Sequence, residues 1–298
     1  MASIERVSRD MSDMSDNTPR ACVAGWPIAH SRSPLIHSFW LRSLGIEGVY
    51  DKVAVPPGEF AEFAESVGRT GLIGANVTVP HKEAAFAACD WLTANAADLG
   101  AVNTLWRENG KLCGDNTDVA GFLANLDEQA PGWRDETQSA VILGAGGAAR
   151  AVVQALVSAG ADRIVIVNRT FERAERLASR FARAARAEPW GALPPLLTNA
   201  DLLVNASSLG MTGRPALEID LDPLGARAIV ADIVYVPLET PLLAAARSRG
   251  LRAIDGLGML LHQAAPGFER WFGVRPAVTP QLRALIETDI VSSGKEKA

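Results

Sequence analysis

Lys82 is the residue in this chain best placed to move a proton. It follows Pro80 and His81 and stands in the first turn of an expected helix. A helix start already carries partial positive charge, so an ammonium group is electrostatically misplaced there. If Lys82 is also partly buried, both effects disfavour the charged form, which suits a proton donor or acceptor near neutral pH. A lysine that simply extends into water is the alternative.

A partner for this lysine is offered by the polar stretch Gly114-Asp115-Asn116-Thr117-Asp118. Asn109-Gly110 is a strong β-hairpin signal, so the flanking strands should deliver Asn103 and this stretch to one end of a sheet. Asp115 or Thr117 can cap the helix that follows. That leaves Asp118 ionised at the helix start and available to orient the lysine.

Two further polar groups fit a hydroxylated acid as ligand. In His30-Ser31-Arg32-Ser33-Pro34, Ser33 is the expected helix cap and Pro34 the first helical residue. Capping does not account for Ser31, and two hydroxyls beside a positive helix end form a neutral clamp for a carboxylate. Strand alternation sends Asn76 and Thr78 to one face, where they bond either a ligand or neighbouring backbone.

A glycine-rich turn at residues 139–150, SAVILGAGGAAR, predicts a second kind of site. Gly144, Gly146 and Gly147 let the backbone approach a pyrophosphate, whose charge free amides at a helix start would meet. Methyltransferases use a similar turn, so the turn alone is a weak signal. The strand before it, the helix to Ala159 and the strand at 163–167 complete a βαβ unit and favour a dinucleotide.

The tip of that second strand favours NADP over NAD. An NAD site places a carboxylate there for the ribose hydroxyls, whereas this chain has Asn168, Arg169 and Thr170. Arg169 and Arg173 are able to form charge-assisted hydrogen bonds to an extra phosphate. The alternative is that both arginines are solvated charges at a helix start.

Composition limits the class of protein. The chain has 298 residues, which is long enough for two domains. With 48% hydrophobic and 21% charged residues, it has the composition of a soluble globular protein. Its net charge of −5 argues against binding to nucleic acids or anionic membranes. Its three cysteines cannot all pair with one another and show no close spacing, which predicts reduced thiols in the cytoplasm. No signal-type apolar stretch precedes the first strand, and the four histidines lack metal-ligand spacing, so no metal is expected.

The coarse pattern gives an α/β fold throughout. Strands are expected at 21–24, 49–55 and 72–79, helices at 34–44 and 59–67, and polar mobile tails at 1–19 and 292–298. Pro266-Gly267 should kink or end the last long helix early. Ligand-binding residues then fall at strand ends, as is usual in open α/β sheets.

These segments together resemble the shikimate dehydrogenase family. The resemblance runs in order from about Ala21 to Phe272 and rests on the segments GWPIAHSRSP, GANVTVPHKE, GAVNT, GDNTD, GAGGAAR, NRT and DGLGMLLHQA. The chain departs from the family at Val119 and Ala120, where glycine is frequent, and at Ile233, where methionine is common. Neither departure removes a reacting group.

Carried over by position, the resemblance implies a role for each site residue. It implies that Ser31 and Ser33 hold a substrate carboxylate and that the ring hydroxyls are bound by Asn76, Thr78, Lys82, Asn103, Asp118 and Gln263, with Tyr235 nearby. It also implies a pyrophosphate cradle at Gly144, Ala145, Gly146, Gly147 and Ala148. The adenosine end would lie at Asn168, Arg169, Thr170 and Arg173, and the nicotinamide at Ile233 and Gly256.

The resemblance further implies two domains with a cleft between them. Residues 20–118 and 256–291 would form an α/β substrate-binding catalytic domain, and residues 119–255 an inserted Rossmann-type, doubly wound NADP-binding domain. The activity implied is NADPH-dependent reduction of 3-dehydroshikimate to shikimate in aromatic amino acid biosynthesis, by a monomer or homodimer. The alternatives are a quinate/shikimate dehydrogenase with broader cofactor use, and a non-catalytic sensor of a shikimate-like acid.

Overall fold

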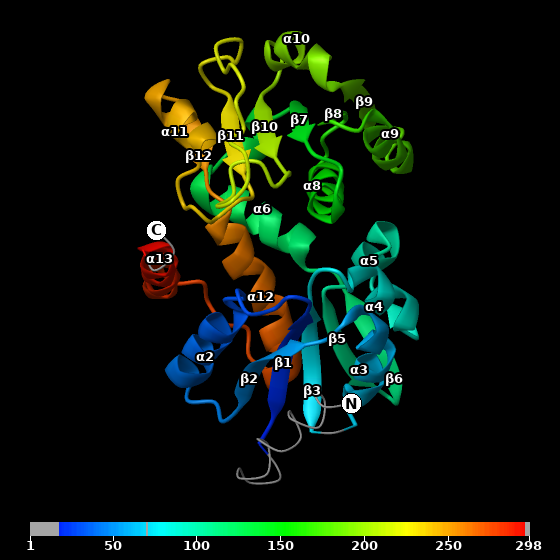
Figure 1. Ribbon diagram of the computed structural model, residues 1–298. Coiled ribbons are helices and arrows are strands. Elements are labelled where there is room, and N and C mark those ends of the chain that lie inside the picture. The colour runs from blue at the N-terminus through cyan, green and yellow to red at the C-terminus, as the bar shows by residue number, and fades with distance from the viewer. Residues whose placement is uncertain (1–17, 70, 296–298) are drawn as a thin grey trace. The chain divides into compact units, whose positions relative to one another are not determined.

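The computed structural model describes residues 18–69 and 71–295, which form two compact units (Figure 1). The first unit comprises the described residues up to Thr117 together with Ala264–Leu282, and the second comprises Asp118–Gln263 and the chain from Arg283. Of the predicted N-terminal tail, residues 1–17 lie outside the described residues. The Pro19 carbonyl accepts a hydrogen bond from the backbone of Val49.

The sheet of the first unit is mixed. Its six strands lie in the order β2-β1-β3-β5-β6-β4, in which β1, β2 and β3 are parallel and β5 is antiparallel to both neighbours. The predicted hairpin is confirmed, with Asn109 and Gly110 at φ values of 51° and 80°. The strands are β1 (Arg20–Gly25), β2 (Val49–Ala54), β3 (Leu72–Val77), β4 (Trp91–Leu92), β5 (Thr104–Glu108) and β6 (Lys111–Asp115).

Helices cover both faces of this sheet. Residues of α3, α4 and α5 share one buried cluster with strand residues such as Ala24 and Ala75. Trp271 of α12 packs in another cluster with Val23 and Trp106. The helices are α2 (Ser33–Leu44), the 3-10 turn η1 (Pro57–Glu59), α3 (Phe60–Ser66), α4 (Lys82–Ala88), α5 (Ala94–Leu99) and the C-terminal half of α12 (Leu257–Phe272).

Gly74 on β3 allows α12 to lie close against this sheet. A Cβ atom at Gly74 would lie 1.9 Å from Nε1 of Trp271, and that nitrogen donates a 3.0 Å hydrogen bond to the Leu105 carbonyl. We expect Gly74→Ala to lower the free energy of unfolding by about 2 to 3 kcal/mol, because the indole is displaced. Thermal denaturation measures the loss. Gly58→Ala is the control, since its Cβ would meet nothing within 4 Å, and equal melting temperatures for the two variants would contradict this packing.

The sheet of the second unit is parallel throughout, with strand order β12-β11-β10-β7-β8-β9. This is the doubly wound order, and it reverses between β7 and β10, where ligands bind at the carboxyl ends of the strands. The strands are β7 (Ser139–Leu143), β8 (Arg163–Asn168), β9 (Ala185–Pro189), β10 (Leu202–Asn205), β11 (Ile229–Asp232) and β12 (Arg252–Ile254). The predicted βαβ unit around the glycine-rich turn is confirmed by β7, α8 and β8.

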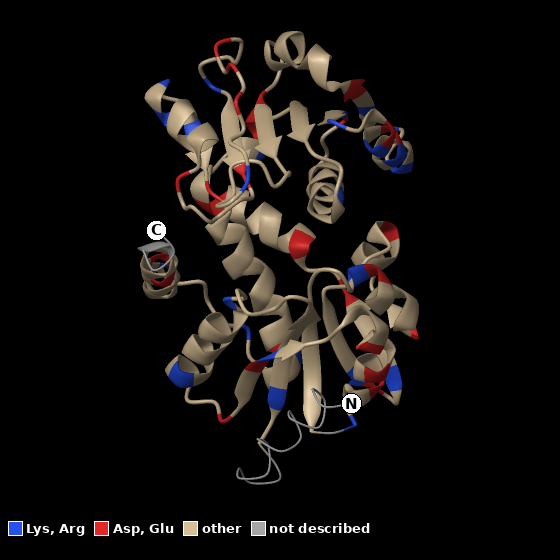
Figure 2. Ribbon diagram, in the orientation of Figure 1, with Lys and Arg blue, Asp and Glu red and all other residues tan. Residues whose placement is uncertain are grey.

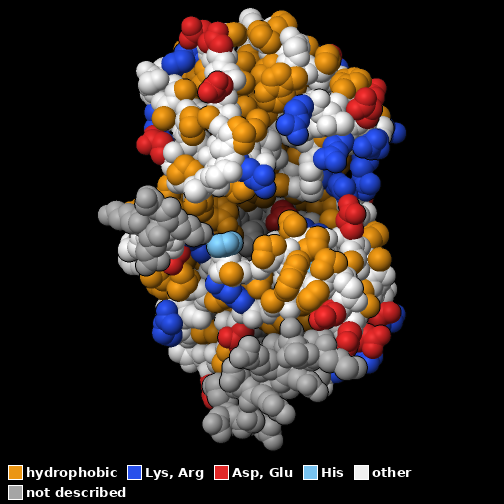
Figure 3. Space-filling view, viewed as in Figure 1, with side chains coloured by type: hydrophobic (Ala, Val, Ile, Leu, Met, Phe, Trp, Pro, Cys, Tyr) orange, Lys and Arg blue, Asp and Glu red, His pale blue; other side chains and the backbone are white. Residues whose placement is uncertain are grey.

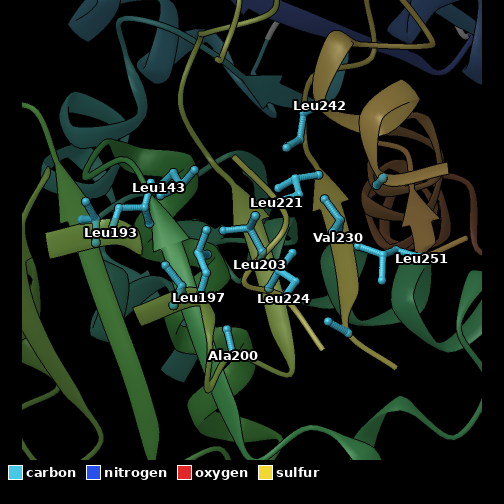
Figure 4. Packing of buried hydrophobic residues seen from close by; sticks show 14 of the residues in the cluster. Leu143, Leu193, Leu197, Ala200, Leu203, Leu221, Leu224, Val230, Leu242 and Leu251 are labelled. Carbon is cyan, nitrogen blue, oxygen red and sulfur yellow. The ribbon is translucent and has the colours of Figure 1, made fainter. Parts of the chain in front are cut away.

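Alternate residues of these strands are buried on opposite faces. Leu143, Leu203 and Val230 pack with Leu197 of α10 and Leu242 of α11 (Figure 4). Intervening residues such as Ile142 are fully buried too, so both faces of the sheet are covered. The helices are α6 (Asp118–Gln129), α7 (Trp133–Glu136), α8 (Gly147–Ser158), α9 (Phe171–Arg180), η2 (Trp190–Ala192), α10 (Leu193–Leu197), α11 (Pro241–Ser248) and α13 (Pro280–Lys295). No helix among the described residues is long and apolar enough to cross a bilayer.

Two helix ends differ from expectation. Of the two outcomes expected at Pro266-Gly267, a kink or an early helix end, the early end was wrong, since α12 contains Pro266 and continues to Phe272. Ala265 and Phe268 on either side are buried, and their packing offsets the backbone hydrogen bond that proline removes. The tail expected from residue 292 is helical through Lys295, because α13 buries Leu282, Ile286 and Ile290 on one face, and residues 296–298 lie outside the described part.

Candidate active site

In the first unit, backbone hydrogen bonds bring Asn76, Lys82 and Asn103 to one edge of the sheet. The backbone of Val77 donates to the Asn103 carbonyl at 2.8 Å, and that of Val102 donates to the Lys82 carbonyl at 2.9 Å. Lys82 is half-buried and is the first residue of α4, as predicted. This edge therefore places one cationic residue beside two amides.

The Asn103 side chain connects this edge to the end of β6. Its Oδ1 accepts hydrogen bonds from Thr104 Oγ1 at 2.9 Å, from the Thr117 backbone at 2.9 Å and from Thr117 Oγ1 at 3.2 Å. Asp115 accepts from the Asn116 backbone at 2.7 Å and from the Thr93 hydroxyl. Asp118, the next residue after Thr117, begins α6 and is 9% exposed.

Asn76 is held by a residue that the sequence analysis did not single out. Tyr50 Oη on β2 donates a 2.6 Å hydrogen bond to Asn76 Oδ1. Asn76 Nδ2 donates to the Asn103 carbonyl and to Thr104 Oγ1 at 3.1 and 3.3 Å, so the amide has a single orientation. Burial raises the pKa of Tyr50 well above its usual value, which keeps the hydroxyl a donor. The only sign of this role in the sequence was a tyrosine within the strand expected at 49–55.

The two serines of the expected carboxylate clamp lie side by side. Ser31 Oγ donates to Ser33 Oγ at 3.3 Å and accepts from the Ser33 backbone at 3.4 Å. The prediction that Ser33 caps α2 was wrong, because Arg32 occupies the cap and Ser33 is already helical and buried. With Ser33 one position inside the helix, the Ser31 hydroxyl satisfies its amide. Thr78 follows β3, with its backbone bonded to the Ala24 carbonyl at 2.9 Å.

His37 lies directly behind this edge as a neutral, fully buried ring. It stacks on Tyr50 with centroids 3.8 Å apart, and neither ring nitrogen makes a hydrogen bond of normal geometry among the described residues. Burial lowers the pKa of His37 to about 3, although the neighbouring Asn76 side chain opposes the shift. The unfolded chain, with an ordinary imidazole, takes up a proton below about pH 6.5.

Acid therefore removes the stability that neutral His37 contributes. The contribution is complete above about pH 6.5 and falls by about 1.4 kcal/mol per pH unit as the pH drops toward about 3. His37→Phe keeps the stacking on Tyr50 but cannot ionise. The free energy of unfolding of this variant, relative to that of the wild type, should therefore rise by about 1.4 kcal/mol for each unit that the pH falls below about 6.5. Urea denaturation of both proteins between about pH 7.5 and 4.5 measures the difference, and a difference independent of pH would contradict the neutral ring.

In the second unit, the glycine-rich turn fits a bound pyrophosphate. Gly144 has a φ of +118°, which favours glycine, and follows β7. Gly146 is the cap of α8 without a side-chain hydrogen bond, and the first turn of α8 has no acidic residue. A Cβ at Gly146 or Gly147 would meet nothing within 4 Å, so the space above the helix amides is open. Ala145 and Ala148 flank these two glycines in the turn.

The expected phosphate-binding residues follow β8 as predicted. Asn168 ends the strand and donates a 2.8 Å hydrogen bond to the Thr170 carbonyl, which shapes the loop. Arg169 and Thr170 are exposed, and Arg173 is exposed in the first turn of α9. The ribbon of α9 is blue at its arginine positions in Figure 2, and Figure 3 shows basic side chains gathered over the same region. Neither Arg169 nor Arg173 makes an ion pair within the described residues.

The remaining predicted residues lie at the ends of β11, β12 and along α12. The Ile233 backbone donates to the Asn205 carbonyl at 3.0 Å, and a Cβ at Gly256 would lie 2.3 Å from the Ile233 carbonyl oxygen. Tyr235 is half-buried two residues further on. Gln263 Nε2 donates to the Leu260 carbonyl at 3.0 Å. Lys82 and Asp118 belong to different units.

The structure also shows a polar network that the sequence analysis missed. Asn205 and Asp232 end β10 and β11, and Thr240 precedes α11. All three side chains are buried. Asn205 donates a hydrogen bond to one carboxylate oxygen of Asp232, and Thr240 donates to the other. The signal was present, because a polar residue closes each of the apolar runs LLVN and IVAD.

Three family models match the chain, in order. The shikimate dehydrogenase substrate binding domain matches residues 23–105, the shikimate/quinate 5-dehydrogenase domain residues 128–212, and the shikimate 5'-dehydrogenase C-terminal domain residues 256–286. Together they include the βαβ unit formed by β7, α8 and β8 and the segment that contains Lys82.

Individual proteins agree with these matches. The shikimate dehydrogenase (NADP(+)) of Methylocella silvestris is 56% identical over 93% of this chain and 99% of its own length. A crystal structure of shikimate 5-dehydrogenase from Thermus thermophilus, in complex with NADP(H) and shikimate, is 37% identical with a TM-score of 0.80, covering 92% of this chain and 99% of that one. Quinate dehydrogenase from Corynebacterium glutamicum, in complex with NAD, is 29% identical with a TM-score of 0.83, covering 91% and 99%. On this evidence, the chain belongs to the shikimate dehydrogenase family.

Proposed function

We propose that this protein is an NADP-dependent shikimate dehydrogenase that reversibly reduces 3-dehydroshikimate to shikimate. The observation that carries the proposal is the sheet edge on which a half-buried lysine at a helix start lies beside two fixed amides. A titratable cation next to hydroxyl-binding groups is what reduction of a ketone on a polyol ring requires. The family relationship supplies the substrate class.

Substrate binding is assigned to the first unit and to two residues of the second, Gln263 and Tyr235. Ser31 and Ser33 hold the carboxylate, because their adjacent hydroxyls lie at the start of α2. Asn76, Thr78, Asn103, Gln263 and Tyr235 bind or border the ring hydroxyls. In functional terms, residues 20–118 and 256–291 then form the catalytic domain, and residues 119–255 the cofactor domain.

NADP is assigned to the carboxyl edge of the parallel sheet. The turn Gly144–Ala148 holds the pyrophosphate, and Asn168, Arg169, Thr170 and Arg173 hold the adenosine end with its phosphate. Ile233 and Gly256 border the nicotinamide. When bound, the reduced cofactor supplies the hydride that the ketone carbon receives.

Lys82 and Asp118 handle the proton. As the carbonyl oxygen gains negative charge, the Lys82 ammonium stabilises it and donates one proton, giving the hydroxyl of shikimate and a neutral amine. Asp118 orients the lysine and balances its charge, and the amine regains its proton from water. In the reverse direction the neutral amine accepts the hydroxyl proton.

A quinate/shikimate dehydrogenase is the second candidate, favoured by the solved quinate dehydrogenase structure. The absence of an acidic residue after β8 favours NADP over NAD. Initial rates on shikimate and on quinate, each with NADP+ and NAD+, decide between the two. A high rate for shikimate with NADP+ alone supports the proposal, and equal rates for quinate with NAD+ would overturn it. If NADPH is not consumed with 3-dehydroshikimate, the proposed activity is refuted and the non-catalytic sensor remains as the alternative.

We also propose that the protein acts in the cytoplasm, in the biosynthesis of aromatic amino acids through chorismate, as a monomer or homodimer. Its net charge of −5 supports the absence of a nucleic-acid partner. Cys22, Cys89 and Cys113 are free thiols, as suits a reducing compartment. Sedimentation equilibrium measures the oligomeric state.

A further inference from the structure

Asn205 and Asp232 form a buried polar junction at the carboxyl edge of the second unit's sheet. They are the last residues of β10 and β11, are paired in register, and are 0% and 1% exposed. Asn205 Nδ2 donates a 2.9 Å hydrogen bond to Asp232 Oδ1. The junction therefore connects the two strands where their loops begin.

Each side chain also holds the loop that follows its own strand. Asn205 Oδ1 accepts from the backbone and hydroxyl of Ser207 at 3.1 and 2.7 Å, and Nδ2 also donates to the Leu209 carbonyl at 3.0 Å. Asp232 Oδ1 accepts from the Val234 backbone at 3.0 Å, and Oδ2 accepts from Thr240 Oγ1 at 2.7 Å. Both loops are thus fixed at several points.

Thr240 extends the junction into the helix that follows. Its Oγ1 accepts a 3.3 Å hydrogen bond from the Leu243 backbone and so caps α11 while it donates to Asp232. The hydroxyl uses its donor and acceptor capacity at once. A valine of similar shape at this position would lose both bonds, whereas serine would keep them.

The backbone that this junction fixes borders the expected cofactor residues. A Cβ at Gly144 would lie 2.8 Å from the carbonyl oxygen of Ala206, the residue after Asn205. A Cβ at Gly256 would lie 2.3 Å from that of Ile233, the residue after Asp232. The loops after β10 and β11 therefore form close backbone contacts with the pyrophosphate turn and with the start of α12. A shift of either loop reaches one of these glycines.

Fixing two loops with a buried carboxylate costs free energy of desolvation. Burial raises the pKa of Asp232 to about 6, although its three hydrogen bonds oppose the shift. Removing a charge from water costs stability that well-packed apolar residues would not lose. The network is therefore better explained by the geometry it imposes on the loops than by stability.

We propose that Asp232, with Asn205 and Thr240, is a positioning residue that holds these two loops in the conformation that binds the nicotinamide end of NADP. The inference rests on the proposed function, since it takes NADP as the cofactor. It concerns binding at the carboxyl edge of one sheet and does not depend on which substrate is reduced. Cofactor binding can therefore test it separately from turnover.

The experiment compares NADP+ binding by isothermal titration calorimetry in Asp232→Asn, Thr240→Val and Thr240→Ser. We expect the first two to weaken NADP+ binding about tenfold, since each disturbs hydrogen bonds of a buried charged group, and Thr240→Ser to bind within about twofold of the wild type. In steady-state assays, KM for NADP+ should rise with little change in KM for shikimate.

Asp201→Asn is the matched control. Asp201 Oδ2 accepts hydrogen bonds from the backbones of Gln138 and Ser139 and from the Ser139 hydroxyl, at the opposite edge of the same sheet. It should lose comparable thermal stability without losing NADP+ affinity. Wild-type affinity in Asp232→Asn and Thr240→Val, or equal weakening in Asp201→Asn, would overturn the inference. A wild-type protein that binds NADP+ but does not oxidise shikimate would refute the proposed function and leave this inference standing.

Discussion

Lys82→Ala should reduce kcat for the reduction of 3-dehydroshikimate by about 100- to 10,000-fold, the range for loss of a general acid. The residue is half-buried at the start of α4, and backbone hydrogen bonds place it on the same sheet edge as Asn76 and Asn103. Without the amine, charge on the carbonyl oxygen has no proton donor at that point. NADP+ binding should stay within about twofold, because the cofactor residues are in the other unit.

Two variants make this result specific. Lys82→Arg retains positive charge but cannot release a proton near neutral pH, so it should be nearly as inactive as the alanine variant. Lys111→Ala removes an exposed lysine from the hairpin of the same unit and should keep wild-type turnover. Stopped-flow absorbance of NADPH gives kcat, and calorimetry gives the NADP+ affinity. Wild-type turnover in Lys82→Ala would refute the assignment.

Replacing both Arg169 and Arg173 with Ala should raise KM for NADP+ by about 10- to 100-fold and leave KM for NAD+ almost unchanged. A hydrogen bond to a charged group contributes about 1.5 to 3 kcal/mol, and exposure of both arginines places the expected loss at the lower end. The phosphate of NADP is the group that they contact in the proposal. NAD lacks that phosphate and therefore has nothing to lose.

The control for this prediction lies further along the same arginine-rich segment. Arg176 and Arg183 are exposed, and their double alanine variant removes the same charge from the unit without touching the loop after β8. It should change KM for NADP+ by less than about twofold at about 0.15 M salt, because distant surface charges are screened. Equal effects of the two double variants would mean that net charge, not a phosphate contact, sets the affinity.

Local patterns predicted the elements of the fold that are determined locally. The hairpin at Asn109-Gly110 and the βαβ unit at the glycine-rich turn depend on nearby residues, and both are present. One error arose where packing decided the outcome, since Pro266 stays within α12 because its neighbours are buried. The other is local, since the cap of α2 lies one residue earlier than predicted, at Arg32 in place of Ser33.

The candidate site shows the same division. Lys82, Asn76 and Asn103 were recognisable because strand ends and helix starts place ligands in a predictable way. Tyr50 could not be assigned to Asn76 from sequence, because that contact depends on β2 and β3 both pairing with β1. The Asn205–Asp232 junction likewise requires β10 and β11 to be neighbours although a long loop separates them in the chain.

The return of Ala264–Leu282 to the first unit has a consequence for how a ribosome makes this protein. Until Trp271 emerges, the growing chain has no indole to pack against Gly74 and Leu105, and one side of the first sheet faces water with Val23 and Trp106 on it. A nascent sheet with this exposed apolar surface is prone to aggregation and is a binding site for chaperones. The core of the first unit can therefore be completed only after residues 264–282 have been synthesised.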